Sequence, residues 1–256
     1  MEEKVNLSIV LATHNEEKNI GECLRLVKNW CKEIIVVDGG SGDKTVTIAK
    51  NLGAKVLIVP NLANFHINKQ KAIDLATSDW ILQLDADERV EEKLKLEIIQ
   101  VIKNGTFDGY WIPRKNHFLG RFLMKGGVYP DYTMRLYRRG KGKLPQKDVH
   151  EQAYVEGEVG YLKTPLIHMS DVNFQRYLLR WNRYTDLIAG DLLTRQFNLV
   201  ITGINYLIIK PIFWFLNIYV RHKGFMDSWQ GFVFAFFSGL RFPMAFIKYL
   251  NKKICA

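Results

Sequence analysis

The chain is poor in cysteine, which limits how its fold can be stabilised. Three cysteines occur in 256 residues, Cys23, Cys31 and Cys255, and none has the paired spacing of a metal-binding motif. A sparse, odd count argues against a disulfide framework and suits a reducing compartment. The first residues lack the basic, apolar and small-residue pattern of a signal peptide. The sequence also has no internal repeat and no low-complexity segment.

Acidic residues are too few to balance the basic ones. Lys and Arg number 36 against 26 Asp and Glu, giving a net charge of +10. This excess favours anionic partners such as nucleotides, nucleic acid or an anionic membrane surface. Hydrophobic residues make up 48% of the chain, which is enough for a substantial core. The length fits one large domain, or one domain with an appendage.

The first part of the chain alternates apolar, β-branched runs with amphipathic segments. We predict strands over residues 7–12, 34–37, 56–59 and 80–84, and helices that begin near Asn15, Val46, Lys69 and Glu91. This alternation predicts a mostly parallel sheet covered by helices on both faces. Ligands bind such sheets at the carboxyl ends of the strands. We therefore expect functional side chains at Thr13, Asp38 and Asp85.

The rest of the chain changes character twice. Strand-like pieces at 109–113 and 132–137, separated by glycine-rich and basic loops, predict an antiparallel flank of the sheet. From about Asp171 the pattern is helical. Residues 199–256 hold 14 of the 32 aromatic residues, together with seven Lys or Arg and one acid.

Two long apolar stretches in this tail, 199–220 and 229–250, are each interrupted near the middle. Lys210-Pro211 interrupts the first, and Arg241 and Pro243 interrupt the second. A membrane span needs about 20 apolar residues, and a central lysine is costly there. We therefore predict two interfacial helices in an anionic membrane surface. The alternative is a buried helical hairpin or the interface of a homo-oligomer.

The pair Asp85-Ala86-Asp87 directly follows an apolar run. Strand side chains alternate between faces, so carboxylates at i and i+2 point to the same side. Two such oxygen ligands at the carboxyl end of a buried strand suit Mg²⁺ or Mn²⁺ carrying a diphosphate. For an isolated Asp-x-Asp, the alternative is a solvated turn.

Three further polar clusters fall on the same predicted edge. Residues 12–17 could hold a base or ribose after the first strand, Asp38 could accept hydrogen bonds from a uracil or ribose, and Lys69 could meet a phosphate. Taken singly, each cluster has an ordinary alternative. These are a helix N-cap, a turn, and a solvated helix face.

In order and separation, the four clusters resemble the inverting family 2 glycosyltransferases, especially the lipopolysaccharide-core glucosyltransferase branch. The resemblance rests on Thr13-x-Asn15-Glu16-Glu17, Val36-Val37-Asp38-x-x-Ser41-x-Asp43-x-Thr45, Asn68-Lys69-Gln70 and Leu84-Asp85-Ala86-Asp87-Glu88. It extends to Tyr129-Pro130-Asp131, residues 134–139, Val149-His150-Glu151, and His168 with residues 177–185. The hydrophobic, basic tail is similar as well.

The resemblance implies an α/β fold of the GT-A type, Rossmann-like and mostly parallel, over residues 1–168. A C-terminal helical, membrane-associating region would follow over residues 169–256. It also implies a nucleotide-sugar donor, in the first place a UDP-hexose such as UDP-glucose, and a Mn²⁺ or Mg²⁺ ion.

The same resemblance implies roles for individual residues. Asp38 would contact the uridine, Asp85 would lie near the ribose and the metal, and Asp87 would bind the metal with His168 as a third ligand. The implied donor site also includes Thr13, Asn15, Glu16, Lys69, Arg135 and Arg138. Inversion in one displacement needs a general base on the acceptor hydroxyl. Glu151 is the predicted base, and Asp148 is the second choice.

We therefore predict a metal-dependent inverting glycosyltransferase acting on a lipid-linked or cell-envelope glycan. It would lie at the cytoplasmic face of the inner membrane, bound peripherally or monotopically, and it would have no nucleic-acid partner. A sugar nucleotidyltransferase would need a glycine-rich, basic loop after the first strand, and residues 13–18 do not provide one. A non-catalytic module that binds a membrane or a nucleotide would leave the gathered carboxylates without a role.

Overall fold

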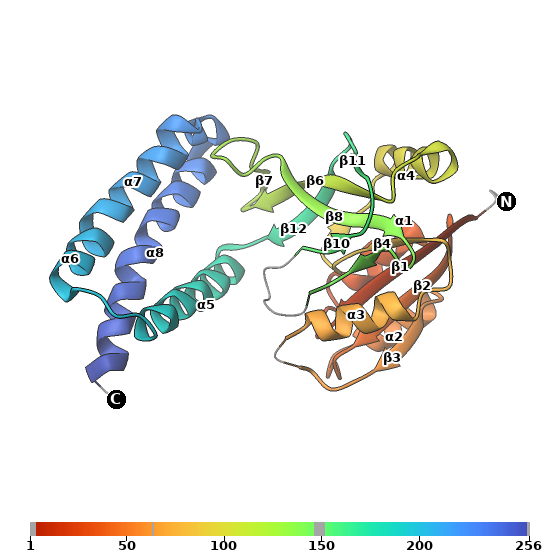
Figure 1. Ribbon diagram of the computed structural model, residues 1–256, viewed down its shortest axis with the longest axis horizontal. Helices are drawn as coiled ribbons and strands as arrows, with labels where there is room; N and C mark the ends of the chain where they lie inside the picture. Colours follow the sequence, from red (N-terminus) through yellow and green to blue (C-terminus); the bar gives the residue numbers. More distant parts are fainter. Residues whose placement is uncertain (1–3, 63, 146–151, 255–256) are drawn as a thin grey trace. The chain divides into compact units, whose positions relative to one another are not determined.

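The computed structural model describes residues 4–62, 64–145 and 152–254 (Figure 1). By its internal contacts the chain forms two compact units. The first unit runs to Arg114 and resumes from Asp131 to His168, and the second joins Lys115–Pro130 to the chain from Met169 onward. The segment 115–130 thus groups with the C-terminal helices, although the sequence pattern assigns it to the sheet domain.

The first unit is built on a mixed sheet. The strands of this sheet in the first unit are β1 (Val5–Thr13), β2 (Cys31–Asp38), β3 (Lys55–Ile58), β4 (Trp80–Gln83), β5 (Glu88–Arg89), β8 (Asp131–Arg138) and β11 (Val159–Tyr161). A separate two-stranded sheet consists of β9 (Gly142–Lys143) and β10 (Tyr154–Val155). Two longer strands, β6 (Gly109–Phe118) and β12 (Leu166–Asp171), continue into the second unit. The helices are α1 (Ile20–Val27), α2 (Thr45–Asn51), α3 (His66–Asp74) and α4 (Glu92–Asn104).

The strand order β3-β2-β1-β4-β8-β6-β12-β5 confirms the predicted parallel sheet with an antiparallel flank. The first four strands pair in parallel, and β8 is antiparallel to both β4 and β6. Side chains on both faces of β1, β2 and β4 are buried. Burial on both faces explains why these strands read as continuous apolar runs rather than as alternating patterns.

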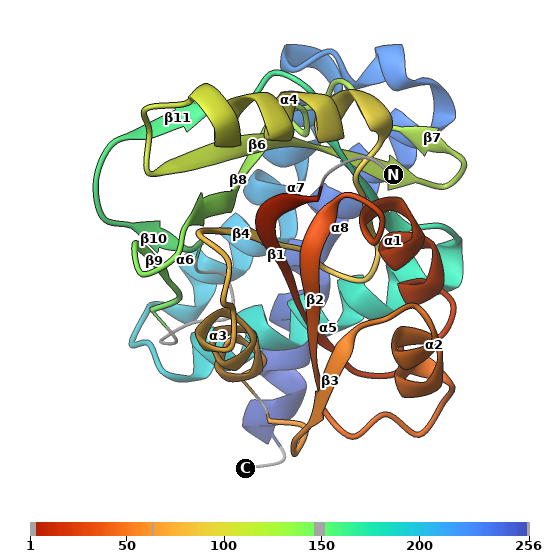
Figure 2. The same ribbon diagram turned by 90° about the vertical axis from the view of Figure 1, so that its right-hand side faces the viewer.

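Helices cover the two faces of this sheet in separate layers (Figure 2). Leu7, Ile9 and Leu11 of β1 pack in one core with side chains of α1, α2 and α4. Val10, which lies between Ile9 and Leu11 on the strand, packs in a second core with Ile73 of α3. Successive residues of the strand therefore serve opposite faces, as the pleat requires.

The carboxyl ends of the parallel strands carry the polar residues that the sequence predicts there. Thr13 ends β1 and Asp38 ends β2, and the two residues are direct partners in the strand register. Asp85 lies two residues beyond the end of β4, which pairs with β1 on its other side. These positions gather the predicted functional residues on one edge of the sheet.

The second unit is mainly helical. It contains β7 (Arg121–Phe122), α5 (Phe174–Leu193), α6 (Leu199–Ile204), α7 (Lys210–Leu216), α8 (Ser228–Ile254), the π-helical turns η1 (Asn205–Ile209) and η2 (Asn217–Arg221), and the 3₁₀ turn η3 (Gly224–Asp227). The run from α6 to η2 folds back on α8 as a hairpin, and α5 also packs against α8 (Figure 1). Phe246 and Tyr249 of α8 form a small core with Ala189 and Leu192 of α5.

One predicted boundary is wrong. The sequence pattern puts Asn15 and the two following glutamates in the first turn of a helix, but α1 begins at Ile20. Asn15 has a φ of 55°, a left-handed conformation that cannot continue a right-handed helix. These residues form a loop before α1. The N–H groups of Asn15 and Glu16 donate to Ser41 and Thr45, while the Glu16 carbonyl accepts from the N–H of Ile20.

Candidate active site

The loops after β1 and β2 are joined by the carboxylate of Asp38. Thr13 Oγ1 donates a hydrogen bond of 2.8 Å to Asp38 Oδ2. The backbone N–H and the hydroxyl of Ser41 donate to Asp38 Oδ1 and Oδ2, both at 2.7 Å. The Asp38 side chain is fully buried. Asp38 therefore fixes the turn that follows it, and the turn itself forms part of the site's surface.

Asn15 joins the same two loops from the other side. Its backbone N–H donates to Ser41 Oγ at 2.8 Å, and its Oδ1 accepts from the Gly42 N–H at 2.9 Å. The Glu16 N–H donates to Thr45 Oγ1 at 2.7 Å. The left-handed conformation of Asn15 thus turns the chain so that two successive N–H groups reach the second loop. Thr13, Asn15, Glu16 and Asp38 are brought together as the sequence predicts.

Asp85 is held between two cations. Its Oδ1 lies 2.5 Å from Lys69 Nζ, and its Oδ2 lies 2.5 Å from Arg135 Nη2. Lys69 and Arg135 are both buried, whereas the Asp85 side chain is 27% exposed. Lys69 therefore does not lie on the solvated helix face that was the alternative for it. Lys69 and Arg135 both point at the carboxylate of Asp85, in the turn that follows β4.

A fully buried glutamate continues this network. Glu88 Oε1 accepts from Arg135 Nη2 at 2.7 Å and lies 3.7 Å from Arg114 Nη1, while its Oε2 accepts from the Asp85 N–H at 2.9 Å. Arg114 in turn donates to Asp131 Oδ2 at 2.7 and 2.9 Å. Positive and negative groups therefore alternate from α3 to the start of β8. This series of alternating charges keeps each buried charge paired with one of opposite sign.

A β-bulge aims Arg135 at this network. Met134 pairs with Trp111 of β6 and Leu136 pairs with Tyr110, so Arg135 is an extra residue with no partner in that ladder. An extra residue re-aims side chains locally and often lies beside an active site. Here the bulge places the guanidinium between Asp85 and Glu88.

The charges set the ionisation of this cluster. Burial by itself would raise the pKa of Asp85, but the positive charges of Arg135 and Lys69 outweigh it and hold that pKa well below its usual range. Burial would lower the pKa of Arg135, but the carboxylates of Asp85 and Glu88 raise it above its usual value. Asp85 is therefore an anion and Arg135 a cation at neutral pH.

Asp87 has a different neighbour. Both carboxylates of the Asp85-Ala86-Asp87 segment lie in the turn after β4 rather than on one face of the strand. Asp87 Oδ2 lies 3.5 Å from His168 Nε2. The antiparallel pairing of β12 with β5 puts His168 opposite Glu88 and so close to Asp87. The structure therefore places Asp87 and His168 together, as the sequence predicts, and gives Asp85 separate partners.

These residues fit a metal ion that arrives with its substrate. Within residues 4–62, 64–145 and 152–254, no group of three or more His, Cys, Asp or Glu side chains is arranged to hold a metal ion. Mg²⁺ in nucleotide sites usually keeps several waters and binds through one or two carboxylates and substrate phosphates. Asp87 with His168, and Asp85 two residues away, can supply that smaller number of ligands.

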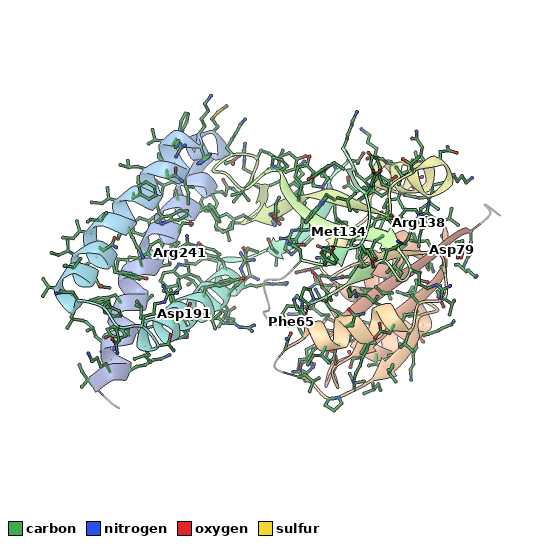
Figure 3. All side chains as sticks on the ribbon, in the orientation of Figure 1. Phe65, Asp79, Met134, Arg138, Asp191 and Arg241 are labelled. Atoms are coloured by element: carbon green, nitrogen blue, oxygen red, sulfur yellow. The ribbon has the colours of Figure 1, made fainter. Side chains whose placement is uncertain are left out.

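Arg138, which the sequence also assigns to the donor site, does not join it. Arg138 pairs in register with Trp80 at the start of β4, and its guanidinium carbon lies 4.7 Å from the centre of the Trp80 ring. Figure 3 shows Arg138 close to Asp79, at the end of β4 that is opposite to Asp85. Glu151 and Asp148, the candidates for the base, lie outside the described residues.

Sequence reasoning missed the structural part of the network. Glu88, Arg114 and Asp131 were not assigned roles, although Glu88 directly follows Asp87 and Asp131 lies within the segment that carries the resemblance. Glu88 is fully buried in the structure, and a buried charge needs a charge partner. The identity of that partner depends on contacts distant in sequence.

The fold is that of an α/β protein with charged and polar residues gathered at the carboxyl edge of its sheet. The chain belongs to glycosyl transferase family 2, whose family model matches residues 8–155, more than half of its length. It is 28% identical to the lipopolysaccharide core biosynthesis glycosyltransferase LpsC of Rhizobium meliloti, over 93% of this chain and 92% of that protein. An uncharacterized glycosyltransferase of Rickettsia typhi is 30% identical over 92% of this chain and 85% of its own length.

Solved structures support the GT-A fold. The mannosyltransferase PcManGT from Pyrobaculum calidifontis, solved with GDP-Man and Mn²⁺, aligns with a TM-score of 0.58 at 11% identity, over 98% of this chain and 89% of that chain. TarS of S. aureus, solved with UDP-GlcNAc, aligns with a TM-score of 0.52 at 16% identity, over 90% and 79% of the two chains. At these identities the likeness concerns the fold alone.

Proposed function

We propose that this glycosyltransferase moves a sugar from a nucleotide-sugar donor, in the first place a UDP-hexose such as UDP-glucose, to a hydroxyl of a lipid-linked or cell-envelope glycan. The observation that carries the proposal is the position of Asp85 between Lys69 and Arg135, on the same edge of the sheet as the turn fixed by Asp38. The similarity to LpsC supports the acceptor class. The proposed catalytic domain is residues 1–168.

On the donor side, the protein's own groups can bind the nucleotide and its phosphates. The Asp38 carboxylate already accepts three protein hydrogen bonds, so we assign uridine binding to the turn that it orders, together with Asn15 and Glu16. Lys69 and Arg135 bring two positive charges to the expected place of the diphosphate. Positioned cations stabilise the charge that develops on a departing phosphate.

A divalent ion would be held by Asp87, with Asp85 and His168 beside it. When bound, the ion would act as a Lewis acid on the leaving diphosphate. The cations around Asp85 also balance its charge when no ligand is bound. Lys69 already neutralises one oxygen of Asp85, so no unpaired negative charge stands there before the ion and the donor bind.

On the acceptor side, inversion by single displacement requires a base opposite the leaving group. Glu151 is the proposed base, and Asp148 is the alternative. Both proposals come from the order of residues in the family pattern, since these positions lie outside the described residues. The chain resumes at Gln152, whose Oε1 accepts a long hydrogen bond of 3.4 Å from the Met134 N–H. This contact brings Gln152 beside β8.

For location, we propose the cytoplasmic face of the inner membrane. Two helical segments are long and apolar enough to cross a membrane, Leu199–Arg221 with mean hydropathy 1.7 and Gly224–Ile254 with mean hydropathy 1.3. Basic residues lie at both ends of the hairpin, at Arg221–Lys223 and at Lys252–Lys253. A hairpin lying flat in one leaflet puts both groups at anionic head groups, whereas a spanning hairpin would send one group across against the positive-inside rule.

The experiment that tests the transfer reaction is a donor screen. Purified protein in mild detergent would be mixed with Mn²⁺ or Mg²⁺ and a panel of UDP-, GDP- and dTDP-sugars, and nucleotide release would be followed. We expect metal-dependent release of UDP from one sugar, lost in Asp87→Asn and kept in Asp79→Asn, a matched change at the opposite end of β4. If no donor is turned over or bound, the catalytic proposal is wrong.

A further inference from the structure

Lys210 and Arg241 interrupt the apolar stretches of the helical unit, and the structure turns both of them toward aromatic rings between the helices. Lys210 Nζ lies 3.7 Å from the centre of the Tyr206 ring and 5.2 Å from that of Phe242. The Arg241 guanidinium carbon lies 5.0 Å from the centres of the Trp214 and Phe242 rings. One ring, that of Phe242, is therefore shared by two positive charges.

Neither charge is paired with an acid. Among the described residues no carboxylate forms an ion pair with Lys210 or Arg241, and Arg241 Nε is buried without a hydrogen-bond partner. The one acid of the hairpin, Asp227, instead accepts hydrogen bonds from the backbone N–H groups of Met124 and Lys125 at 3.0 and 2.7 Å. The two cations therefore have aromatic rings in place of counter-ions.

Rings alone are a weak substitute for an anion. A cation over an aromatic face gains about 0.5–2 kcal/mol. Lys210 and Arg241 are both partly buried, and partial loss of water by an unpaired charge works against that gain. Two like charges at one ring also repel each other. This balance favours a bound anion. Lys210 and Arg241 both lie about 5 Å from the centre of the Phe242 ring, and together they present several N–H donors, which suits the oxygens of a phosphate.

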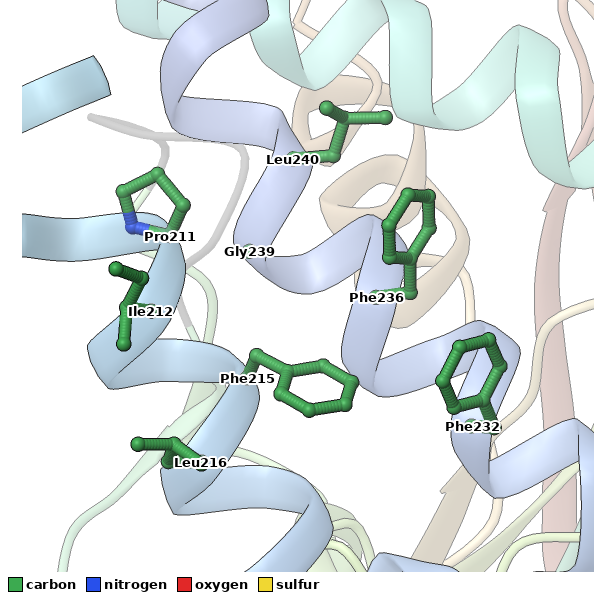
Figure 4. A pocket seen from close by; sticks show the side chains of 8 residues that line it. All are labelled: Pro211, Ile212, Phe215, Leu216, Phe232, Phe236, Gly239 and Leu240. Carbon is green, nitrogen blue, oxygen red and sulfur yellow. The ribbon is translucent and has the colours of Figure 1, made fainter. Parts of the chain in front are cut away.

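The surroundings indicate what the phosphate is attached to. The outer side of the hairpin is apolar, with Val200 and Ile201 exposed by 70% and 67%. A slot of about 320 Å³ opens between α7 and α8 (Figure 4), lined by Pro211, Ile212, Phe215, Leu216, Phe232, Phe236, Gly239 and Leu240. A free phosphate ion would leave this surface in water, but acyl chains joined to the phosphate would cover it.

We propose that Lys210 and Arg241 form a binding site for the phosphate group of an acylated lipid. The phosphate would meet the two cations, and its acyl chains would lie on the apolar surface of the same hairpin. The site lies in the second unit, does not include the residues of the sheet edge, and does not depend on the proposed transfer reaction. It gives the two mid-helix cations a role beyond attraction to a charged membrane.

The test is direct binding of short-chain lipids that differ in one group. The full chain in a nonionic detergent would be titrated calorimetrically with dihexanoylphosphatidic acid, with dihexanoylglycerol and with inorganic phosphate. We expect saturable binding of the phosphatidic acid, weakened roughly tenfold or more in Lys210→Gln/Arg241→Gln because charge-assisted bonds are lost. The matched control, Arg195→Gln/Lys125→Gln, removes one arginine and one lysine from exposed positions of the same unit and should bind like the parent.

Each other result would overturn the proposal. Equal weakening in the two double variants would mean general attraction to a basic surface. Equal affinity for inorganic phosphate would mean a free-anion site, and equal affinity for dihexanoylglycerol would mean binding by the apolar surface alone. Lys210→Arg keeps the charge and should keep binding, so the proposal stays testable even if the double variant unfolds. No transfer activity is measured, so failure of the catalytic proposal would leave these results unchanged.

Discussion

Arg135 Nη2 lies 2.5 Å from Asp85 Oδ2 and 2.7 Å from Glu88 Oε1, so a single guanidinium nitrogen joins the proposed donor site to a fully buried acid. The β-bulge in β8 makes this geometry possible by placing Arg135 outside the regular pairing. Arg135 therefore serves the stability of the unit as well as its proposed chemistry.

Replacing Arg135 by Met should strongly destabilise the first unit. Removing one partner of a buried ion pair typically costs about 3–5 kcal/mol, because an unpaired charge stays buried. Here Glu88 would keep Arg114, at 3.7 Å, as its remaining cation, so we expect about 3 kcal/mol in urea-induced unfolding. Arg139→Met changes an exposed arginine of the same segment and should stay within about 0.5 kcal/mol of the parent. Similar losses in both variants would contradict the role assigned to the network.

Lys69 tests the donor site more selectively. In Lys69→Met the pKa of Asp85 should rise, since one of the two cations that lower it is gone, while Arg135 still pairs with the carboxylate. We expect UDP to bind roughly ten- to a hundredfold more weakly, the usual effect of losing a charge-assisted contact. Binding of UDP to the purified protein would be measured with and without Mn²⁺.

Lys71→Met is the control for this variant, because Lys71 lies two residues away on α3 and is exposed. It should bind UDP like the parent. Unchanged UDP affinity in Lys69→Met, with the fold intact, would show that the lysine serves only as a counter-ion for Asp85 and does not contact the donor.

Much of this site follows from rules that connect sequence to sheet geometry. Thr13, Asp38 and Asp85 could be placed on one edge because each follows an apolar, β-branched run and because parallel strands end on the same side. Arg135 and Arg138 could not be told apart in this way. The antiparallel pairing of β8 with β4 separates them, because it puts Arg138 opposite Trp80 at the start of β4. The bulge that aims Arg135 is a local break in the strand register, and such a break leaves no mark on an alternating pattern.

Long-range contacts explain the other gaps. The grouping of residues 115–130 with the C-terminal helices depends on Asp227, which binds the N–H groups of Met124 and Lys125. Lys210 reads from the sequence as a costly charge inside an apolar helix. The contact of Lys210 with Tyr206, four residues earlier, could be predicted from helical spacing. Its contact with Phe242 could not, because the fold of the hairpin brings Phe242 close to Lys210.

A buried carboxylate at the other end of the sheet predicts the acid sensitivity of the fold. Burial by itself would raise the pKa of Glu33, but hydrogen bonds from Lys55, Ser8 and Thr77 outweigh it and lower the pKa from 4.5 to about 2. A pKa lower in the folded state means stability that is present above pH 4.5 and is lost as the pH falls toward 2. The shift corresponds to at most about 3 kcal/mol.

Glu33→Gln should remove this part of the pH dependence. Its free energy of unfolding should lie below that of the parent at pH 6, and the difference should shrink toward pH 2.5. Urea-induced unfolding of both proteins over this range measures it, and other acids cancel in the comparison. A difference that does not change with pH would show that Glu33 contributes through packing rather than through its charge.

The hairpin depends on two glycines where backbones meet, and these give the last prediction. A Cβ on Gly231 would lie 1.9 Å from the carbonyl oxygen of Gly224, and one on Gly239 would lie 2.6 Å from that of Pro211. Gly231→Ala should therefore push η3 away from α8 and destabilise the helical unit by about 1–3 kcal/mol. Gly190→Ala, in α5 with no atom within 4 Å of the added carbon, should instead stabilise by up to about 1 kcal/mol. Thermal unfolding followed by circular dichroism should show a lower unfolding temperature for Gly231→Ala and a higher one for Gly190→Ala. Alanine separates two packed segments at position 231, whereas at position 190 it favours the helical backbone.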